Sequence, residues 1–296
     1  MYRTLGAGVY TFGLSALIII LVCVASCVLS EFVFQKLMKQ KSTVSDLSAV
    51  VTGLILAVNL SSDIPVWMAA LGSIFAIVIV KQLFGGIGQN FMNPALAARV
   101  FLLISFTKIM TAFPEEIRTF FPTADAVSSA TPMAIIKTGG SVSWFDMIFN
   151  THSGCIGEAS ALAVLAGAAY LLFKKVITLK IPLTYILSAV GFVVLIQLFS
   201  GNPHLLTTDY VITQLFGGGL LVGAFYMAND YVTSPITPVG QIVYALLLGL
   251  MTALIRVVSP SSEGVSYAII IGNVLTPLIE KFTVHKPLGR RRKVNA

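Results

Sequence analysis

The chain has 296 residues, of which 56% are hydrophobic and only 10% are charged, and its mean hydropathy is +0.91. Soluble domains usually carry about 25% charged residues, so this composition excludes a soluble globular protein and indicates an integral membrane protein. The formal net charge of +7 comes from basic residues gathered near the ends of apolar segments. We therefore interpret it as a sign of membrane orientation and expect no nucleic-acid partner.

Nine continuously apolar segments follow one another along the chain. A helix needs about 20 apolar residues to cross the hydrocarbon core, and continuous apolar sequence favours helices over the alternating strands of a barrel. Several segments are shorter than this, so we expect some helices to be tilted, broken or re-entrant. The expected helices cover residues 10–34, 44–60, 64–80, 91–110, 158–173, 181–199, 210–229, 239–258 and 265–282.

Clusters of basic residues predict which helix ends face the cytoplasm, because Lys and Arg are enriched on that side. Counting crossings places all three clusters on the same side and residues 111–157 outside. The same count places Met1 outside with nine helices, which is an unusual arrangement, so we expect either that a further helix precedes Met1 or that residues 1–10 form part of a first helix. The clusters are Lys36, Lys39 and Lys41; Lys174, Lys175 and Lys180; and Lys286 with Arg290, Arg291, Arg292 and Lys293.

Two copies of one pentapeptide indicate an internal duplication. Residues 82–86 and 214–218 both read Gln-Leu-Phe-Gly-Gly, and the predicted topology places them on opposite sides of the membrane, as inverted repeats require. We therefore expect an all-α polytopic membrane protein with about nine to ten transmembrane helices in inverted five-helix repeats. The expected parts are a first membrane repeat (1–110), an external loop (111–157), a second membrane repeat (158–284) and a basic cytoplasmic tail (285–296).

The stretch Asn90-Phe-Met-Asn93-Pro94 predicts a helix N-terminus inside the membrane repeat. Asn suits the cap position and Pro suits the first turn, and three preceding glycines allow the chain to bend. The free N–H groups and the positive dipole end of such a terminus can hold an anionic or carbonyl-rich ligand. A capping motif without a ligand is the alternative.

Three charged residues lie at or near predicted helix ends. Arg99 follows one to two turns into the helix of Pro94, and it should face protein or water rather than lipid. It could contact a ligand or pair with an acid such as Asp46 or Asp230. These two carboxylates flank predicted helices on the cytoplasmic side, where they are candidate ligands for a cation or a proton or, alternatively, solvated helix-end charges.

Cysteine and histidine patterns do not predict a metal centre. The three histidines have no metal-ligand spacing, and the three cysteines indicate no disulfide framework. Cys23 and Cys27 share a helix face, which would suit half of a metal or iron–sulfur site, but buried small hydrophobes are the simpler interpretation. There is no arrangement of a nucleophile with a base, so we expect no catalytic residue.

The long polar stretch contains the run Asp125-x-x-Ser128-Ser129-Ala130-Thr131. Small residues allow a bulky group to approach the backbone closely. A threonine in such a turn, with an acidic residue nearby, is a candidate acceptor for a phosphoester bond. An ordinary Ser/Thr turn is the alternative.

Four stretches together resemble the RnfD and NqrB family of membrane redox subunits, and they occur in the order of that family. The shortness of the chain after its last helix favours the RnfD branch, from ion-translocating ferredoxin:NAD oxidoreductase complexes. The alternative branch is NqrB, from the sodium-pumping quinone reductase. The stretches are Lys81–Arg99, Ser128–Pro132, Phe225–Asp230 and Leu254–Val257.

The resemblance implies that FMN is esterified through its phosphate to Thr131 by a flavin transferase. Asp125, Ser128, Ser129 and Ala130 complete the motif, with Ser129 standing where the family usually has glycine. It also implies a second, non-covalent flavin such as riboflavin. Its binding residues would be Asn90, Asn93 and Arg99.

The resemblance further implies a function in electron transport coupled to ion transport. The chain would pass electrons between ferredoxin and NAD, together with the other Rnf subunits (A, B, C, E and G), of which G is the external flavin protein. It would lie in the plasma or inner membrane of a prokaryote, with the Thr131 loop outside and the C-terminus in the cytoplasm. Asp46 and Asp230 would belong to a path for Na⁺ or H⁺.

Two other classes of function compete with the redox subunit. A channel or transporter without redox chemistry would use the same inverted repeats with broken helices. A passive assembly scaffold would need only the helix bundle. Neither class predicts a bound flavin, so a flavin chromophore separates both from the redox interpretation.

Overall fold

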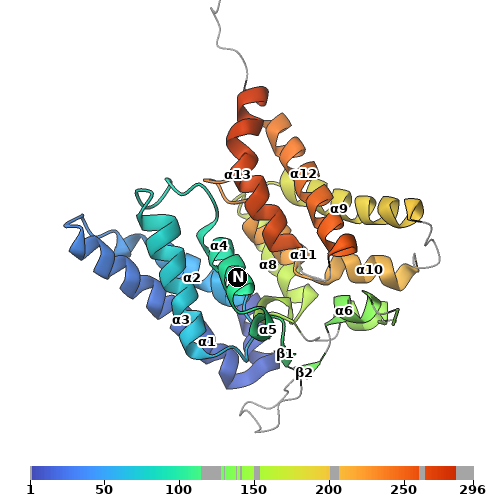
Figure 1. Ribbon diagram of the computed structural model, residues 1–296, viewed down its shortest axis with the longest axis horizontal. Helices are drawn as coiled ribbons and strands as arrows, with labels where there is room; N and C mark the ends of the chain where they lie inside the picture. Colours follow the sequence, from blue (N-terminus) through green and yellow to red (C-terminus); the bar gives the residue numbers. More distant parts are fainter. Residues whose placement is uncertain are drawn as a thin grey trace, which may run out of the picture.

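The computed structural model describes residues 2–114, 128–129, 131–137, 139–140, 142–149, 154–200, 207–259 and 264–284. Helices dominate this part of the chain, and the first and last groups of helices lie on opposite sides of the molecule (Figure 1). All the predicted apolar segments coincide with helices. The expectation of an all-α polytopic membrane protein is therefore confirmed.

The elements divide into two helical groups and a middle stretch. The first group contains α1 (Tyr2–Leu37), η1 (Val44–Asp46), α2 (Ser48–Val58), α3 (Val66–Ile74), the π-helix η2 (Phe75–Gln82), α4 (Pro94–Ser105) and α5 (Thr107–Met110). The middle stretch contains β1 (Phe113–Pro114), β2 (Ser128–Ser129), α6 (Pro132–Lys137), α7 (Trp144–Phe149) and η3 (Ile156–Glu158). The second group contains α8 (Ala161–Phe173), α9 (Lys180–Phe199), α10 (Thr208–Phe216), α11 (Leu220–Val222), the π-helix η5 (Gly223–Met227), α12 (Pro238–Val258) and α13 (Val265–Thr283).

The helices differ in their ability to cross a membrane. In the described ranges, α1, α9, α12 and α13 are long and apolar enough to span it alone, and α10 with α11 and η5 forms a fifth candidate that bends by 46°. Shorter apolar helices make up the remaining predicted segments, which confirms the expectation of short and broken helices. They are Ser48–Val58, Val66–Gln82, Pro94–Ser105 and Ala161–Phe173.

Helix α1 extends beyond the expected segment 10–34 and includes most of residues 1–10, as one of the two alternatives expects. Its backbone leaves the helical region at Gly13 (φ 67°), so a short helix precedes the main one. Cys23 and Cys27 are fully buried in the main helix. Their burial agrees with the interpretation of both as small hydrophobes.

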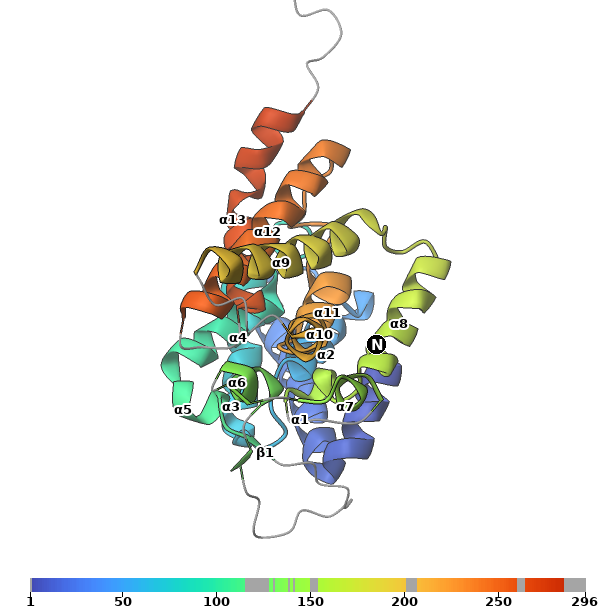
Figure 2. The same cartoon turned by 90° about the vertical axis from the view of Figure 1, so that its right-hand side faces the viewer.

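The core is continuous between the two helical groups. Buried apolar side chains of α1, α2 and α4 belong to the same cluster as those of α8, α9 and α12. In the second group, α9 packs against α12 (Figure 2), and Gly249 of α12 allows the two helices to approach closely. A Cβ atom at Gly249 would lie 2.7 Å from the backbone nitrogen of Ala189.

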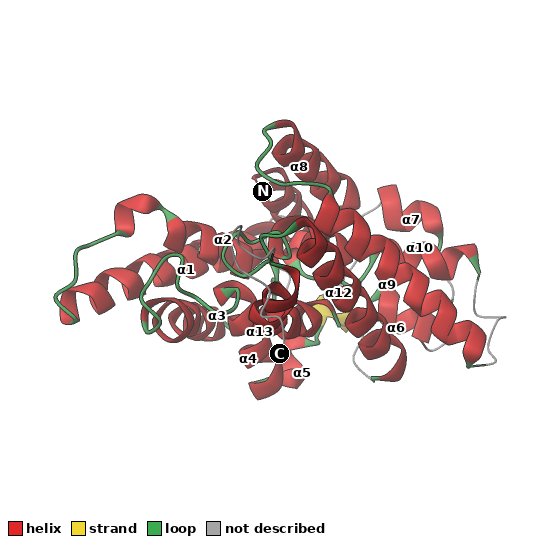
Figure 3. Cartoon of the chain, turned by 90° about the horizontal axis from the view of Figure 1, so that it is seen from above, coloured by secondary structure: helices red, strands yellow, loops and turns green. Residues whose placement is uncertain are grey.

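The middle stretch is attached to both groups. Strands β1 and β2 pair antiparallel, with Phe113 opposite Ser129, and the pair lies between the ends of α5 and α6 (Figure 3). Further along, η3 packs against α1 and α2, and the backbone N–H of Ile156 donates to the carbonyl oxygen of Leu60 at 2.9 Å. The last residues of the expected external loop are therefore buried against the bundle. The inverted relation of the two groups stays a prediction.

The close approach of α9 to α12 yields a test of packing. We expect Gly249→Val to lower the free energy of unfolding by about 1–3 kcal/mol, because the added side chain would overlap the backbone of α9. Gly191→Val is the matched control, since a Cβ there would meet nothing within 4 Å. Thermal unfolding of the full chain in detergent measures both, and equal melting temperatures would contradict the packing argument.

Candidate functional site

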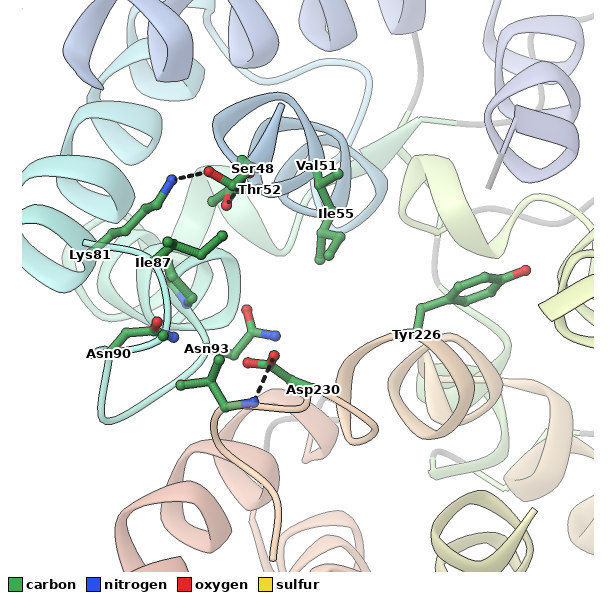
Figure 4. Close-up of a pocket in the computed structure, with 13 residues that line it drawn as sticks. Ser48, Val51, Thr52, Ile55, Lys81, Ile87, Asn90, Asn93, Tyr226 and Asp230 are labelled. Atoms are coloured by element: carbon green, nitrogen blue, oxygen red, sulfur yellow. Dashed lines mark hydrogen bonds between the residues drawn. The ribbon is translucent and has the colours of Figure 1, made fainter. Parts of the chain in front are cut away.

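A cavity of about 170 Å³ lies where the two helical groups meet. Its lining comes from α2, from the end of η2, from the loop before α4 and from the turn after η5. Asn93 and Asp230 point toward each other across this space, whereas Tyr226 points away (Figure 4). The cavity thus brings together the polar residues of two stretches that the sequence singled out separately.

Asn93 is positioned by its role as the cap of α4. Its side-chain oxygen accepts from the backbone N–H groups of Ala95 (3.1 Å) and Leu96 (3.4 Å), and Pro94 occupies the first turn. The predicted cap is therefore confirmed. Because the oxygen is engaged in the cap, the amide nitrogen is the group that Asn93 can offer to a ligand.

The loop before this cap depends on glycine. Gly85, Gly86 and Gly88 have positive φ angles of 113°, 92° and 81°, which glycine adopts without strain. The loop is closed near its end by Asn90, whose amide nitrogen donates to the carbonyl oxygen of Met92 at 3.1 Å. This geometry places Asn90 in the cavity wall beside Asn93.

Asp230 closes the opposite wall. It lies in a turn after η5, where its carboxylate accepts from the Thr233 hydroxyl (3.0 Å) and the Val232 backbone N–H (3.4 Å). Burial raises the pKa of the Asp230 carboxyl above its ordinary value, and these two hydrogen bonds partly offset that rise. The carboxylate therefore takes up a proton at a higher pH than a solvated aspartate does.

A second cavity of about 330 Å³ adjoins the first and shares Gly88, Asn90 and Val232 with it. Residues of α13, including Asn273 and Glu280, form its other wall. Small-molecule sites usually measure about 300–1,000 Å³. The two adjoining cavities are thus of a size that suits a ring-sized ligand.

A buried ion pair lies next to the first cavity, and sequence reasoning missed it. Lys81 lines the cavity, and its ammonium donates to the Glu31 carboxylate at 2.8 Å. Glu31 has no exposed surface, and Gln82 donates to the same oxygen at 2.6 Å. Within the described part of the chain, its other oxygen, Oε2, is buried without a hydrogen-bond partner. The available signal was a carboxylate inside an apolar segment, which is a functional hypothesis by default.

Asp46 is connected to this ion pair although it is exposed itself. Its carboxylate accepts from the Ser48 hydroxyl at 2.5 Å, and that hydroxyl accepts from Lys81 at 2.5 Å. As the alternative interpretation expects, Asp46 is an exposed charge near the start of a helix. A chain of contacts nevertheless joins it through Ser48 and Lys81 to Glu31.

Arg99 lies outside the lining of both cavities. It is buried, as the sequence predicts for a charge in this helix, and it donates to the Asn59 side-chain oxygen (2.7 Å) and to the Cys155 sulfur (3.3 Å). The structure therefore does not bring Arg99 together with Asn90 and Asn93, and its contact with a flavin stays a prediction.

Thr131 lies apart from the cavity, at the start of α6. It is half-buried, and its hydroxyl accepts from the backbone N–H of Ala134 at 3.3 Å. The backbone of Ser128 and Ser129 forms β2. Asp125 and Ala130 lie outside the described residues, so the full motif is not seen together.

Comparison with known proteins identifies the family. The NQR2, RnfD, RnfE family model matches residues 1–289. The chain belongs to this family. The expectation from the four sequence stretches is thereby confirmed.

Three curated members of the family align with nearly the whole chain, and each is the D component of its complex. The one from the Na(+)-translocating ferredoxin:NAD(+) oxidoreductase complex of Acetobacterium woodii is 47% identical over 285 residues, covering 95% of this chain and 85% of the relative. The one from the proton-translocating ferredoxin:NAD(+) oxidoreductase complex of Clostridium ljungdahlii is 39% identical over 296 residues, with coverages of 96% and 87%. The one from the ion-translocating oxidoreductase complex of Escherichia coli K12 is 35% identical over 325 residues, with coverages of 97% and 91%.

The contribution of the buried ion pair to stability can be tested with variants of Lys81 and Glu31. We expect Lys81→Met to lower the free energy of unfolding by about 3–5 kcal/mol, because it leaves the Glu31 charge buried without a partner. Adding Glu31→Gln should recover most of this loss, since no unpaired charge remains. Lys36→Met on the exposed side of α1 is the control. Thermal unfolding measures all four chains, and a double variant no more stable than Lys81→Met would contradict the assignment.

Proposed function

We propose that the chain is the flavin-carrying membrane subunit of a redox-driven ion translocase, which passes electrons between ferredoxin and NAD. The observation that carries this proposal is the relation to the three D components over at least 95% of the chain. Their names describe ion-translocating oxidoreductase complexes. Activity would require the other subunits (A, B, C, E and G), with G, the external flavin protein, beside the Thr131 segment.

Thr131 is the proposed attachment residue for FMN. Its hydroxyl is half-buried at the start of a short helix, so a flavin transferase could reach it while the following residues stay packed. When bound, the flavin would link two-electron and one-electron carriers. Ser129, in place of the usual glycine, still suits the short extended segment β2. The segment would face the outside, with the basic C-terminus in the cytoplasm.

A second, non-covalent flavin such as riboflavin is proposed for the two adjoining cavities. The amide nitrogen of Asn93 could donate to a ring carbonyl, and the cavity next to Asn90 is within the usual size of ligand sites. The residues would bind and orient the ring. Arg99 would support the site only indirectly, through its contact with Asn59.

The cation path is proposed to run through the first cavity. Asp230 provides a carboxylate at its wall, and Asp46, Ser48 and Lys81 connect the exposed surface to buried Glu31. Moving one charge against 100 mV stores about 2.3 kcal/mol, which is within reach of a redox step. The names of the relatives include both Na⁺ and proton translocation, so either cation is compatible with the family.

A channel or transporter without redox chemistry is the second candidate. The bent span of α10, α11 and η5 favours it, because broken helices are typical of transporters. A covalent flavin would exclude it. A protein without flavin fluorescence, purified from cells that contain a flavin transferase, would favour the channel or transporter.

Covalent attachment can be tested with two threonine variants. We expect the wild-type chain to show flavin fluorescence on a denaturing gel under ultraviolet light, and Thr131→Ala to lose it completely, because the acceptor hydroxyl is gone. Thr111→Ala is the control, because this exposed hydroxyl donates locally to the Thr107 carbonyl oxygen and lies outside the Ser128–Pro132 stretch. Fluorescence that persists in Thr131→Ala would reject Thr131 as the acceptor.

The role of Asp230 can be tested through competition between protons and Na⁺. Because burial raises the pKa of Asp230, protonation should begin to compete at a higher pH than for an ordinary aspartate, so the half-saturating Na⁺ concentration should rise as pH falls. Asp230→Asn should weaken Na⁺ binding at least tenfold and abolish this pH dependence.

The matched control is Asp63→Asn, whose carboxyl pKa is also raised by burial but which lines neither cavity. Na⁺ uptake and pH change are measured in parallel in vesicles that contain the whole complex. If Asp230→Asn transports either cation as the wild type does, Asp230 is not on the path.

A further inference from the structure

The span formed by α10, α11 and η5 is interrupted by glycines. Gly218 and Gly219 have positive φ angles of 61° and 69°, and the two helical parts meet at 46°. Other residues rarely adopt this backbone. A Cβ at Gly218 would also lie 2.8 Å from the guanidinium of Arg256. We call Gly217–Gly219 the helix break.

Charged side chains close the helix break from two sides. Arg256 of α12 donates to the carbonyl oxygens of Gln214 (2.6 Å), Gly217 (2.9 Å) and Gly218 (3.1 Å), at the C-terminal end of α10. Glu158 of η3 lies beside the N-terminal end of α11, 2.8 Å from where a Cβ of Gly219 would be. The positive group thus meets the negative helix end and the carboxylate meets the positive end, as the helix dipole favours.

Met133 of α6 covers the third side. Its Cγ lies 3.3 Å from where a Cβ atom would be at both Gly217 and Gly218, and its side chain is 1% exposed. Lys137 at the other end of α6 donates to the Ser259 carbonyl oxygen, next to α12, at 2.8 Å. Helix α6 is therefore docked on the helix break only two residues after Thr131.

The half-helix after the break leads directly to the cavity. It runs from Leu220 to Met227, which corresponds to about 12 Å of helix, and Asp230 follows it. This half-helix begins directly after the helix break, which Met133 covers at Gly217 and Gly218, and its other end leads to the carboxylate in the cavity wall. Glycines with positive φ at the first end are suited to act as a hinge.

We infer that Met133 is a positioning residue that couples the segment bearing Thr131 to Asp230 through this half-helix. The inference rests on the proposed function, because it requires FMN on Thr131 and Na⁺ at Asp230. The redox state of the flavin and the occupancy of the cation site then influence each other. By linkage, the free energy by which Na⁺ shifts the midpoint potential of the flavin equals the free energy by which flavin reduction changes Na⁺ affinity.

The test is a redox titration of the flavin in the purified complex, with and without saturating Na⁺. For the wild type we expect a Na⁺-dependent shift that corresponds to a change in Na⁺ affinity of about fivefold or more. Met133→Ala should keep the covalent fluorescence but lose the shift. Met133→Leu, which restores the volume over the helix break, should recover it, and Asp230→Asn should also lose it.

Met147→Ala is the matched control, because Met147 is equally buried in the same middle stretch but lies in α7. It should retain the shift. The inference is overturned if Met133→Ala keeps a wild-type shift, if Met147→Ala loses it too, or if the wild-type potential does not respond to Na⁺. If the wild-type chain shows no flavin fluorescence on a denaturing gel, the proposed function is rejected instead. Failure of the inference and failure of the proposed function are therefore distinguishable.

Discussion

The fold of this protein depends on hydrogen bonds to the backbone N–H and C=O groups at the ends of short helices inside an apolar bundle. Lipid offers no hydrogen bonds, so a helix that ends at membrane depth needs protein groups for its free N–H and C=O groups. Asn93 supplies an acceptor at the start of α4, and Arg256 supplies donors at the end of α10. Polar residues are therefore required within the bundle even before any ligand is considered, and the cavity develops beside one of these ends.

The sequence was sufficient to predict the membrane helices and the cap of α4, because both depend on local composition. Long apolar runs need no distant partner to be helical in a bilayer, and the order Asn-Pro is a local signal for a helix start. The interruption at Gly13 and the residues that close the break of α10 were not predicted. The break after α10 involves side chains far away along the chain, Glu158 and Arg256.

The candidate site was predicted only in part, for the same reason. Asn90, Asn93 and Asp230 were each selected from the sequence, and the structure brings them together around one cavity. Glu31 was overlooked because its partner Lys81 is distant along the chain, and the contacts of Arg99 with Asn59 and Cys155 were not predicted because these two residues carry no charge pattern. Tertiary contacts of this kind leave no periodic signal in a single sequence.

The two π-helices have a consequence for how this chain tolerates insertions and deletions. A π-turn accommodates one residue more than an α-turn, and η2 carries Lys81 whereas η5 precedes Asp230. Removing the extra residue from either segment would let the wide turn relax to an α-turn, so the residues beyond it would keep their orientation. A deletion from an ordinary α-helix would instead rotate everything beyond it by about 100°. The two π-helices are thus places where this chain can lose a residue while the groups that follow still face the cavity.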